Sequence, residues 1–136
     1  MYNIQRFLTK KRTMLRKTNP RLNGAARLAI IQKVWEKADV VPGFNPRIWR
    51  KDCCGALIHK NQYGNRKSAF GWELDHVILK SQGGSNQISN LRPLQWKNNA
   101  SRQVAQLVCS VRSNEAYLKG VKEGLQKRAF QRRRAS

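Results

Sequence analysis

The chain has 136 residues, 40% of them hydrophobic, and a net charge of +21. This length fits one domain whose modest core needs no added crosslinks. The sequence has neither an apolar run long enough to span a membrane nor a secretory signal with an apolar centre, so we expect no membrane partner. The positive excess is larger than solubility requires, and it indicates a polyanionic partner, namely nucleic acid.

The positive charge is concentrated at the two ends. Residues 1–35 contain nine Lys or Arg and no acid, and residues 116–136 contain seven against one Glu. The two ends therefore hold +15, and the 80 residues between them hold +6. Contacts made by such ends would be independent of base sequence and would weaken steeply with salt. The alternative is a pair of solvated tails that serve only solubility.

Charge and apolar pattern divide the chain into three parts. These are a basic N-terminal arm at 1–22, a domain at 23–115, and a basic C-terminal helix or tail at 116–136. The arm has no clear apolar period, and its lack of acids resembles a mitochondrial targeting peptide.

The first element expected in the domain is a helix over 24–38. Asn23 can cap its start, and its apolar stripe includes Ile30, Val34 and Trp35.

Strands are expected in the middle of the chain. The segment 41–46, with two prolines around a glycine, breaks the chain. A strand is expected at 54–59, a turn at 61–65, and the strand that carries the candidate site at 70–78. A short partner strand is expected at 91–94, with a proline that confines it to an edge or an end.

Two helices complete the expected α+β fold. The first covers 96–112, where apolar residues recur at helical spacing, and the second covers 114–130 and becomes almost purely cationic.

The tryptophans are expected to differ in role. Trp35, Trp72 and Trp96 occupy apolar helix or strand positions typical of a core. Trp49 has basic neighbours and is the better candidate for contact with a base or sugar. His59 lies in an apolar run and is expected to be a strand residue.

The three cysteines form no C-x-x-C pair. Cys53 and Cys54 are adjacent, and Cys109 is far away in sequence. An odd count with a vicinal pair is a poor disulfide framework, so we expect free thiols and a reducing, intracellular compartment. Ligands for a structural zinc are missing, and no structural zinc is expected.

The chemically most informative stretch is 71–102, GWELDHVILKSQGGSNQISNLRPLQWKNNASR. Thirteen residues separate His76 from Asn90, and eight separate Asn90 from Asn99. Phosphodiester cleavage needs an anionic oxygen to hold a divalent cation, a base of near-neutral pKa, and a neutral ligand that leaves coordination positions open. Asp75, His76 and Asn99 are those three types.

This stretch resembles the HNH nuclease family in motif and context, above all its small free-standing bacterial and phage members. The same intervals occur in the HNH domain of RNA-guided nucleases. The resemblance implies a ββα-metal core, with Asp-His at the end of one strand, a central Asn after a long loop, and the last ligand on the helix after the second strand. The expected architecture is this core with an N-terminal helix, a C-terminal helix and basic extensions.

The resemblance also implies roles. Asp75 and Asn99 would hold Mg²⁺ or a similar ion, and His76 would deprotonate the attacking water. Asn90 would bond backbone across the loop and so aim the His ring. Strict strand alternation sends Asp75 and His76 to opposite faces, so both can serve one ion only where the strand ends.

Several basic residues are candidates for contacting nucleic acid. Arg102, three residues after Asn99, could clamp a phosphate oxygen. The others are Lys80, Arg92, Arg47, Arg50, Lys51, Arg132, Arg133, Arg134, Lys10, Lys11 and Arg12.

Some flanking residues depart from the family. The free-standing relatives carry Pro where this chain has Leu79, acids where it has Asn86 and Gln87, and Asp where it has Val104.

Three functions therefore stay open: a metal-dependent endonuclease; a structural RNA-binding subunit of a large ribonucleoprotein such as an organellar (mitochondrial) ribosome; and a sequence-specific DNA-binding module. The intact set of Asp75, His76, Asn90 and Asn99 favours the first, and the basic ends and the missing acids favour the second. No recognition helix stands out for the third.

Overall fold

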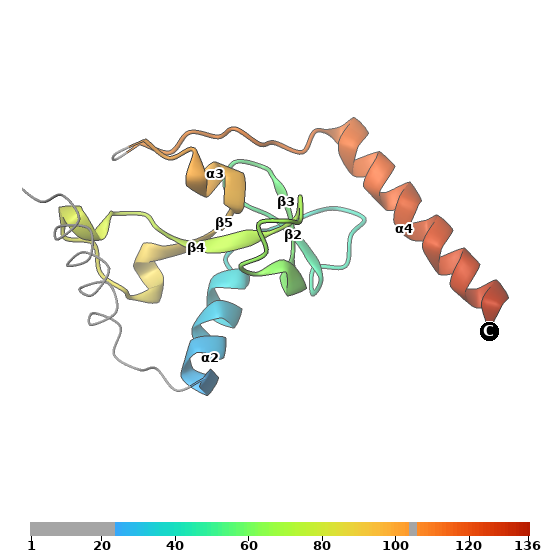
Figure 1. The fold of residues 1–136 in the computed structure, drawn as a ribbon, viewed down its shortest axis with the longest axis horizontal. Coiled ribbons are helices and arrows are strands. Elements are labelled where there is room, and N and C mark those ends of the chain that lie inside the picture. The colour runs from blue at the N-terminus through green and yellow to red at the C-terminus, as the bar shows by residue number, and fades with distance from the viewer. Residues whose placement is uncertain (1–23, 104–105) are drawn as a thin grey trace, which may run out of the picture. The chain divides into compact units, whose positions relative to one another are not determined.

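The computed structural model describes residues 24–103 and 106–136 (Figure 1). The predicted basic arm, with its candidate contact residues Lys10, Lys11 and Arg12, lies outside the described residues.

The chain divides into two compact units, Met1–Ile31 and Gln32–Ser136. Helix α2 (Gly24–Trp35) crosses this division and ends a little earlier than predicted. All other elements belong to the second unit, which also holds the candidate site.

The second unit combines small sheets and helices, so the predicted α+β class is confirmed. One sheet contains three antiparallel strands, β1 (Asp39–Val40), β2 (Trp49–Lys51) and β3 (Leu57–His59), in that order. The other contains two antiparallel strands, β4 (Trp72–His76) and β5 (Leu91–Gln95).

The register of the β4–β5 pair places Trp72 opposite Gln95 and His76 opposite Leu91. Pro93 lies within β5 although it has no N–H to donate. It is tolerated because both strands of a two-stranded sheet are edges, as its sequence position predicted.

The remaining elements are short turns and two further helices. The 3₁₀ turns are η1 (Lys60–Gln62), η2 (Lys80–Gln82) and η3 (Ile88–Asn90). The helices are α3 (Trp96–Ala100) and α4 (Glu115–Ala135).

Asp52 forms the turn between β2 and β3 and connects the two sheets. Its side chain, 1% exposed, accepts from the backbone N–H groups of Cys54 and Ala56 at 3.0 and 2.8 Å. Its other oxygen accepts from the N–H of Gln95 at 2.9 Å and from the Asn98 amide at 3.0 Å. A buried carboxylate needs such donors to replace its lost hydration, so these four bonds fix α3 and β5 against the first sheet.

The predicted burial is confirmed for two of the three tryptophans that were assigned to the core. Trp35 and Trp72 are at most 1% exposed, and their ring centroids lie 5.3 Å apart. Trp96 is half-buried and donates from Nε1 to the carbonyl of Ser68 at 2.8 Å. Trp49, the candidate for contact with nucleic acid, is only 8% exposed because it packs into the core.

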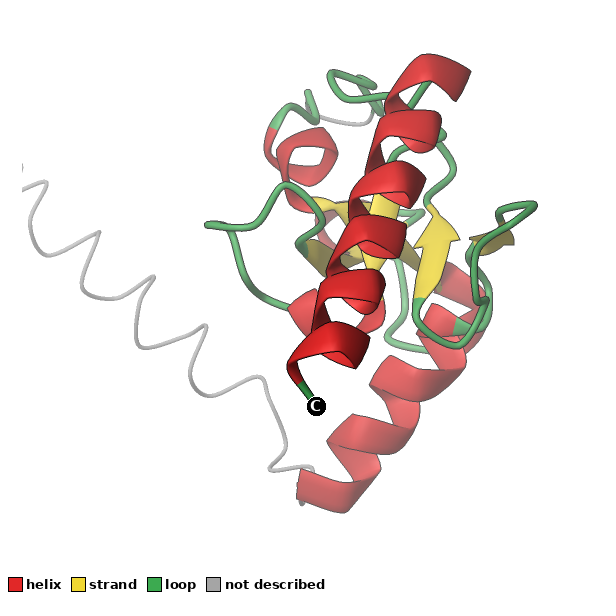
Figure 2. Cartoon of the chain, turned by 90° about the vertical axis from the view of Figure 1, so that its right-hand side faces the viewer, coloured by secondary structure: helices red, strands yellow, loops and turns green. Residues whose placement is uncertain are grey.

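Helix α4 packs on this core through its first half. Figure 2 views the chain from the side on which α4 lies. Leu118, Val121 and Leu125 contact a buried cluster that contains Val41 and Trp49. The second half of the helix is exposed. Among the described residues, no helix combines the length and apolarity that a membrane crossing needs.

The predicted helix over 96–112 is wrong, because α3 ends at Ala100. The chain beyond it is held by hydrogen bonds to side chains instead. The Asn98 amide accepts from the N–H of Val111 at 2.7 Å and donates to the Val111 carbonyl at 3.0 Å. Ser113 Oγ accepts from the N–H of Leu57 at 2.8 Å.

The prediction of free thiols is also wrong for two of the three cysteines. Cys54 and Cys109 form a disulfide, and Cys53 is free and exposed. Because Cys53 and Cys54 are adjacent, the sequence does not show which of them can form a disulfide. In the structure Cys54 is buried beside Asp52, whereas Cys53 is exposed. The crosslink ties the segment after α3 to the turn between β2 and β3.

Candidate functional site

Asn90 organises the loop that joins β4 to β5. Its Oδ1 accepts from the N–H of Ile78 at 2.8 Å, and its Nδ2 donates to the carbonyls of Ile78 and Ser85 at 3.0 and 2.8 Å. These are the cross-loop bonds that the resemblance implied for Asn90. Gly84 is required here, because a Cβ on it would lie 1.8 Å from the Ile78 carbonyl oxygen.

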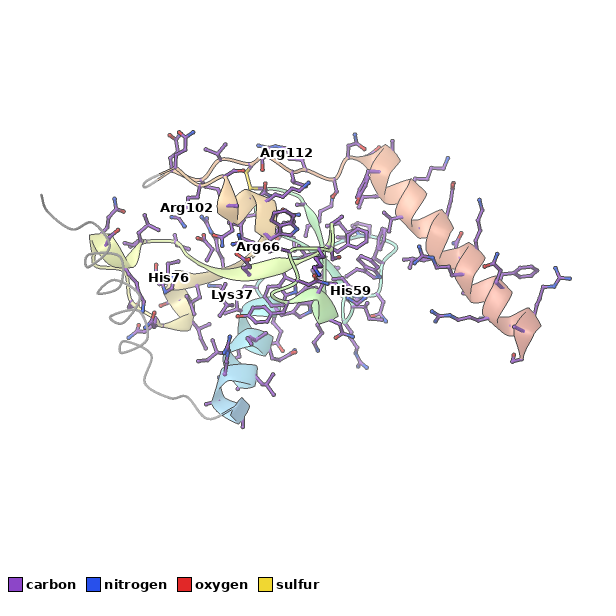
Figure 3. All side chains as sticks on the ribbon, in the orientation of Figure 1. Lys37, His59, Arg66, His76, Arg102 and Arg112 are labelled. Atoms are coloured by element: carbon purple, nitrogen blue, oxygen red, sulfur yellow. A yellow bond between two sulfur atoms is a disulfide. The ribbon has the colours of Figure 1, made fainter. Side chains whose placement is uncertain are left out.

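His76 ends β4, and its ring is held by this loop (Figure 3). Its Nε2 lies 2.9 Å from Oδ1 of Asn86. An amide oxygen only accepts, so Nε2 is the protonated nitrogen and Nδ1 carries the lone pair in the neutral ring. The departure from the family at Asn86 therefore falls on the residue that orients the candidate base.

Asp75 lies on the opposite face of β4 and is paired with two arginines. Its side chain is 4% exposed. Oδ2 accepts from Arg92 Nε at 2.6 Å, and Oδ1 accepts from Arg102 NH1. Arg102 also donates to the carbonyls of His76 and Val77 at 2.6 and 3.0 Å. The two arginines proposed as phosphate contacts are thus held inside the protein by Asp75.

The side chain of Asn99 contacts that of Glu73, which was not among the site residues predicted from the sequence. Asn99 Nδ2 donates to Glu73 Oε2 at 2.6 Å. Arg66 forms a two-pronged pair with the same carboxylate, at 2.5 and 3.0 Å. The Arg66 hydrogen bond, helped by that of Asn99 and opposed by burial, holds the pKa of Glu73 below its usual value.

The donor types on this face suit a hard divalent cation. Glu73 and Asp75 lie two residues apart on one face of β4 and supply carboxylate oxygens, and Asn99 supplies an amide oxygen. Each oxygen of Asp75 already accepts from an arginine, so a cation would have to bind beside two positive charges that repel it. Within the described part of the chain, no group of three or more His, Cys, Asp or Glu side chains is placed to hold a metal ion.

The other predicted contact residues are scattered. Lys80, Arg47, Arg132, Arg133 and Arg134 are exposed. Lys51 is half-buried in β2.

Arg50 has a structural role. Its guanidinium donates to the carbonyls of Pro46 at 2.9 Å and of Glu36 and Ala38, both at 3.1 Å. Arg50 therefore joins the segment after α2 to the segment before β2.

Two structural residues near the site were missed. Lys37 Nζ donates to the carbonyl of Ile88 at 2.8 Å and to that of Leu91, which fixes the entry to β5. No local pattern marks such a contact, since it spans more than 50 residues. Glu73, by contrast, had a signal, because it lies two residues before Asp75 on the same strand face.

Comparison of the chain with protein-family models, with curated proteins and with solved structures yields no match.

Proposed function

We propose that this chain is a nucleic-acid endonuclease of the HNH type, with β4, the loop to β5, and α3 forming a ββα-metal core. The observation that supports this best is the pair of contacts that position His76: Asn90 closes the loop onto Ile78, and Asn86 in that loop holds Nε2 of the ring at 2.9 Å. A base works only when it is aimed, and no described residue bonds to Nδ1, which leaves that nitrogen to take the proton.

In the proposed reaction, a water molecule attacks the phosphorus of a phosphodiester while His76 Nδ1 takes its proton. The bond from phosphorus to the 3′ leaving oxygen breaks, and that oxygen takes a proton from solvent water, which yields 5′-phosphate and 3′-hydroxyl ends as in the resembled family. Asp75 and Asn99 would hold a divalent cation such as Mg²⁺, whose contribution is to stabilise charge on the phosphate and the leaving oxygen.

A second candidate function is supported by the ion pairs of Asp75. A carboxylate that is 4% exposed and bonded to two guanidinium groups is a stable structural feature as it stands. In this reading the chain is a structural RNA-binding subunit of a large ribonucleoprotein, and the +15 of its two ends holds it among RNA phosphates.

Nicking of supercoiled plasmid and cleavage of RNA, each with and without Mg²⁺, test the first proposal. His76→Ala should lower the cleavage rate at least about 100-fold, because it removes the base. Leu28→Ala is the control, since the side chain of Leu28 is 67% exposed on α2 and lies outside the candidate site. Wild type without activity, or a His76→Ala variant as active as wild type, would contradict the endonuclease.

The second candidate has its own test. Cosedimentation with ribosomal particles that survives moderate salt and disappears after RNase treatment is expected of a structural subunit. If the endonuclease test fails and no such association is found, both proposals are wrong.

A further inference from the structure

A cavity of about 460 Å³ lies between the first sheet and helix α4. Trp49, His59 and Phe70 line it from the sheet side, and Leu125, Arg128 and Arg132 line it from the helix. It is separate from the candidate catalytic site, because it contains no residue of β4, β5 or α3. A volume of this size suits a small organic ligand.

The sheet side of the cavity is an aromatic wall. The ring of Trp49 makes edge contacts with the rings of His59 and Phe70, with centroids 4.6 and 4.9 Å apart. Trp49 is nearly buried, whereas His59 and Phe70 are half-buried and keep part of their surface open. Because Trp49 fixes both rings in place, a flat ligand could stack on them without first ordering the wall.

His59 adds a hydrogen-bond donor to the cavity, and its contact with Asn61 shows which ring nitrogen carries the proton. Its Nδ1 accepts from the N–H of Asn61 at 3.1 Å, so in the neutral ring the proton is on Nε2. Burial lowers the pKa of His59, which favours that neutral form at pH 7. No described residue accepts a hydrogen bond from Nε2. The ring therefore has one N–H free to bind an acceptor in the cavity.

The helix side carries two guanidinium groups without acidic partners. Arg128 and Arg132 are four residues apart on α4 and so share one face of the helix. Neither is in an ion pair within the described chain. Arg134 makes a different contact, since its guanidinium carbon lies over the ring of Phe130, 5.7 Å from the ring centroid.

An aromatic wall facing two guanidinium groups matches one class of ligand, a planar base joined to a phosphate. We propose that this cavity binds one unstacked nucleotide of single-stranded nucleic acid. The base packs on Phe70 and His59, its carbonyl accepts from Nε2 of His59, and Arg128 and Arg132 bind the adjacent phosphates. The proposal rests on the nucleic-acid-binding part of the proposed function and is independent of cleavage.

Single strands are expected to bind better than duplex. A paired base is stacked within its duplex and can enter such a cavity only after it unpairs, which costs a few kcal/mol.

Binding of a fluorescent oligouridylate of about 12 nucleotides, followed by anisotropy in EDTA, tests this arrangement. The double variant Arg128→Gln/Arg132→Gln should raise Kd about tenfold or more, because two phosphate contacts are lost and the base is no longer held against Phe70 and His59 by its own phosphates. Lys119→Gln/Lys127→Gln removes the same charge from the same helix at two exposed residues outside the cavity. It should raise Kd about threefold or less. Equal losses in the two variants would overturn the nucleotide site and leave only general electrostatic binding.

Nuclear magnetic resonance supplies a second measurement that does not depend on charge. The chain has two histidines, so the signal of His59 is identified by its survival in His76→Ala. Titration with uridine monophosphate should shift the ring signals of His59 and leave those of His76 unmoved. An unmoved His59 signal would contradict the proposal even if the oligouridylate binds. Failure of wild type to bind any oligonucleotide would instead contradict the proposed function.

Discussion

The carboxylate of Asp75 has two competing uses, and the choice between them decides how the site works. It can neutralise Arg92 and Arg102, as in the structure, or it can hold a divalent cation. A carboxylate oxygen can accept a hydrogen bond and bind a cation at the same time, but the two guanidinium charges beside Asp75 oppose the binding of a cation. Arg102 is the stronger competitor, because its side chain is 9% exposed and also bonds to two backbone carbonyls.

Arg102→Gln should therefore raise the affinity for Mn²⁺, a spectroscopic substitute for Mg²⁺. We expect about tenfold tighter binding, because a nearby positive charge is removed and one oxygen of Asp75 is released. Electron paramagnetic resonance of free Mn²⁺ measures this without reference to catalysis. Arg112→Gln is the matched control, since Arg112 is exposed and outside the site. Equal Mn²⁺ affinity in the two variants would show that Arg102 does not control access to Asp75.

Asn90 and Asp75 show which contacts of the site could be predicted from the sequence and which could not. Asn90 makes the cross-loop bonds that the family resemblance implied for it. The surroundings of Asp75 could not be predicted in the same way. They depend on where the side chains of Arg92 and Arg102 turn, and no linear pattern records that direction.

At the scale of elements, the strands were easier to predict than the segment after α3. The strands β4 and β5 lie within the predicted ranges, apart from one residue at the end of β5, because alternating apolar residues and turn residues mark them. The helix expected over 96–112 rested on valines at helical spacing. The same stretch also alternates, with Cys109, Val111 and Ser113 facing inward and Ser110 and Arg112 outward. β-Branched residues favour that extended alternative, and the contacts to Asn98 decide the outcome.

The disulfide should make a large contribution to keeping this segment in place. Cys54 and Cys109 are separated by 55 residues, so the crosslink removes much of the freedom of the unfolded chain. Replacing both by Ala should lower the free energy of unfolding by about 2 to 4 kcal/mol in urea denaturation without reductant. Cys53→Ser is the control, because Cys53 is exposed and free, and it should leave stability nearly unchanged. Adding reductant should destabilise wild type and Cys53→Ser and leave the double Ala variant unaffected.

If wild type has the same stability with and without reductant, the crosslink does not form in solution. The segment would then depend on Asn98 and Ser113 alone, and the expectation of free thiols would be restored.

At the scale of the whole molecule, the net charge of +21 makes the affinity of the chain for a polyanion strongly dependent on salt. Charge alone does not separate an endonuclease from a structural subunit, because both bind phosphates. The two differ in how much affinity comes from local recognition and how much from released counterions. The dependence of Kd on salt measures the second part directly.

The exposed run Arg132, Arg133 and Arg134 at the end of α4 gives this measurement a defined target. If all three contact phosphates, changing them to Gln should reduce the slope of log Kd against log salt by about 2 to 3 for duplex DNA, because about 0.9 counterion is released per neutralised phosphate. Changing the same three residues to Lys keeps the charge and should keep the slope. A Gln variant with the slope of wild type would mean that this end of α4 is solvated and does not touch nucleic acid, and the binding surface would then have to lie elsewhere on the chain.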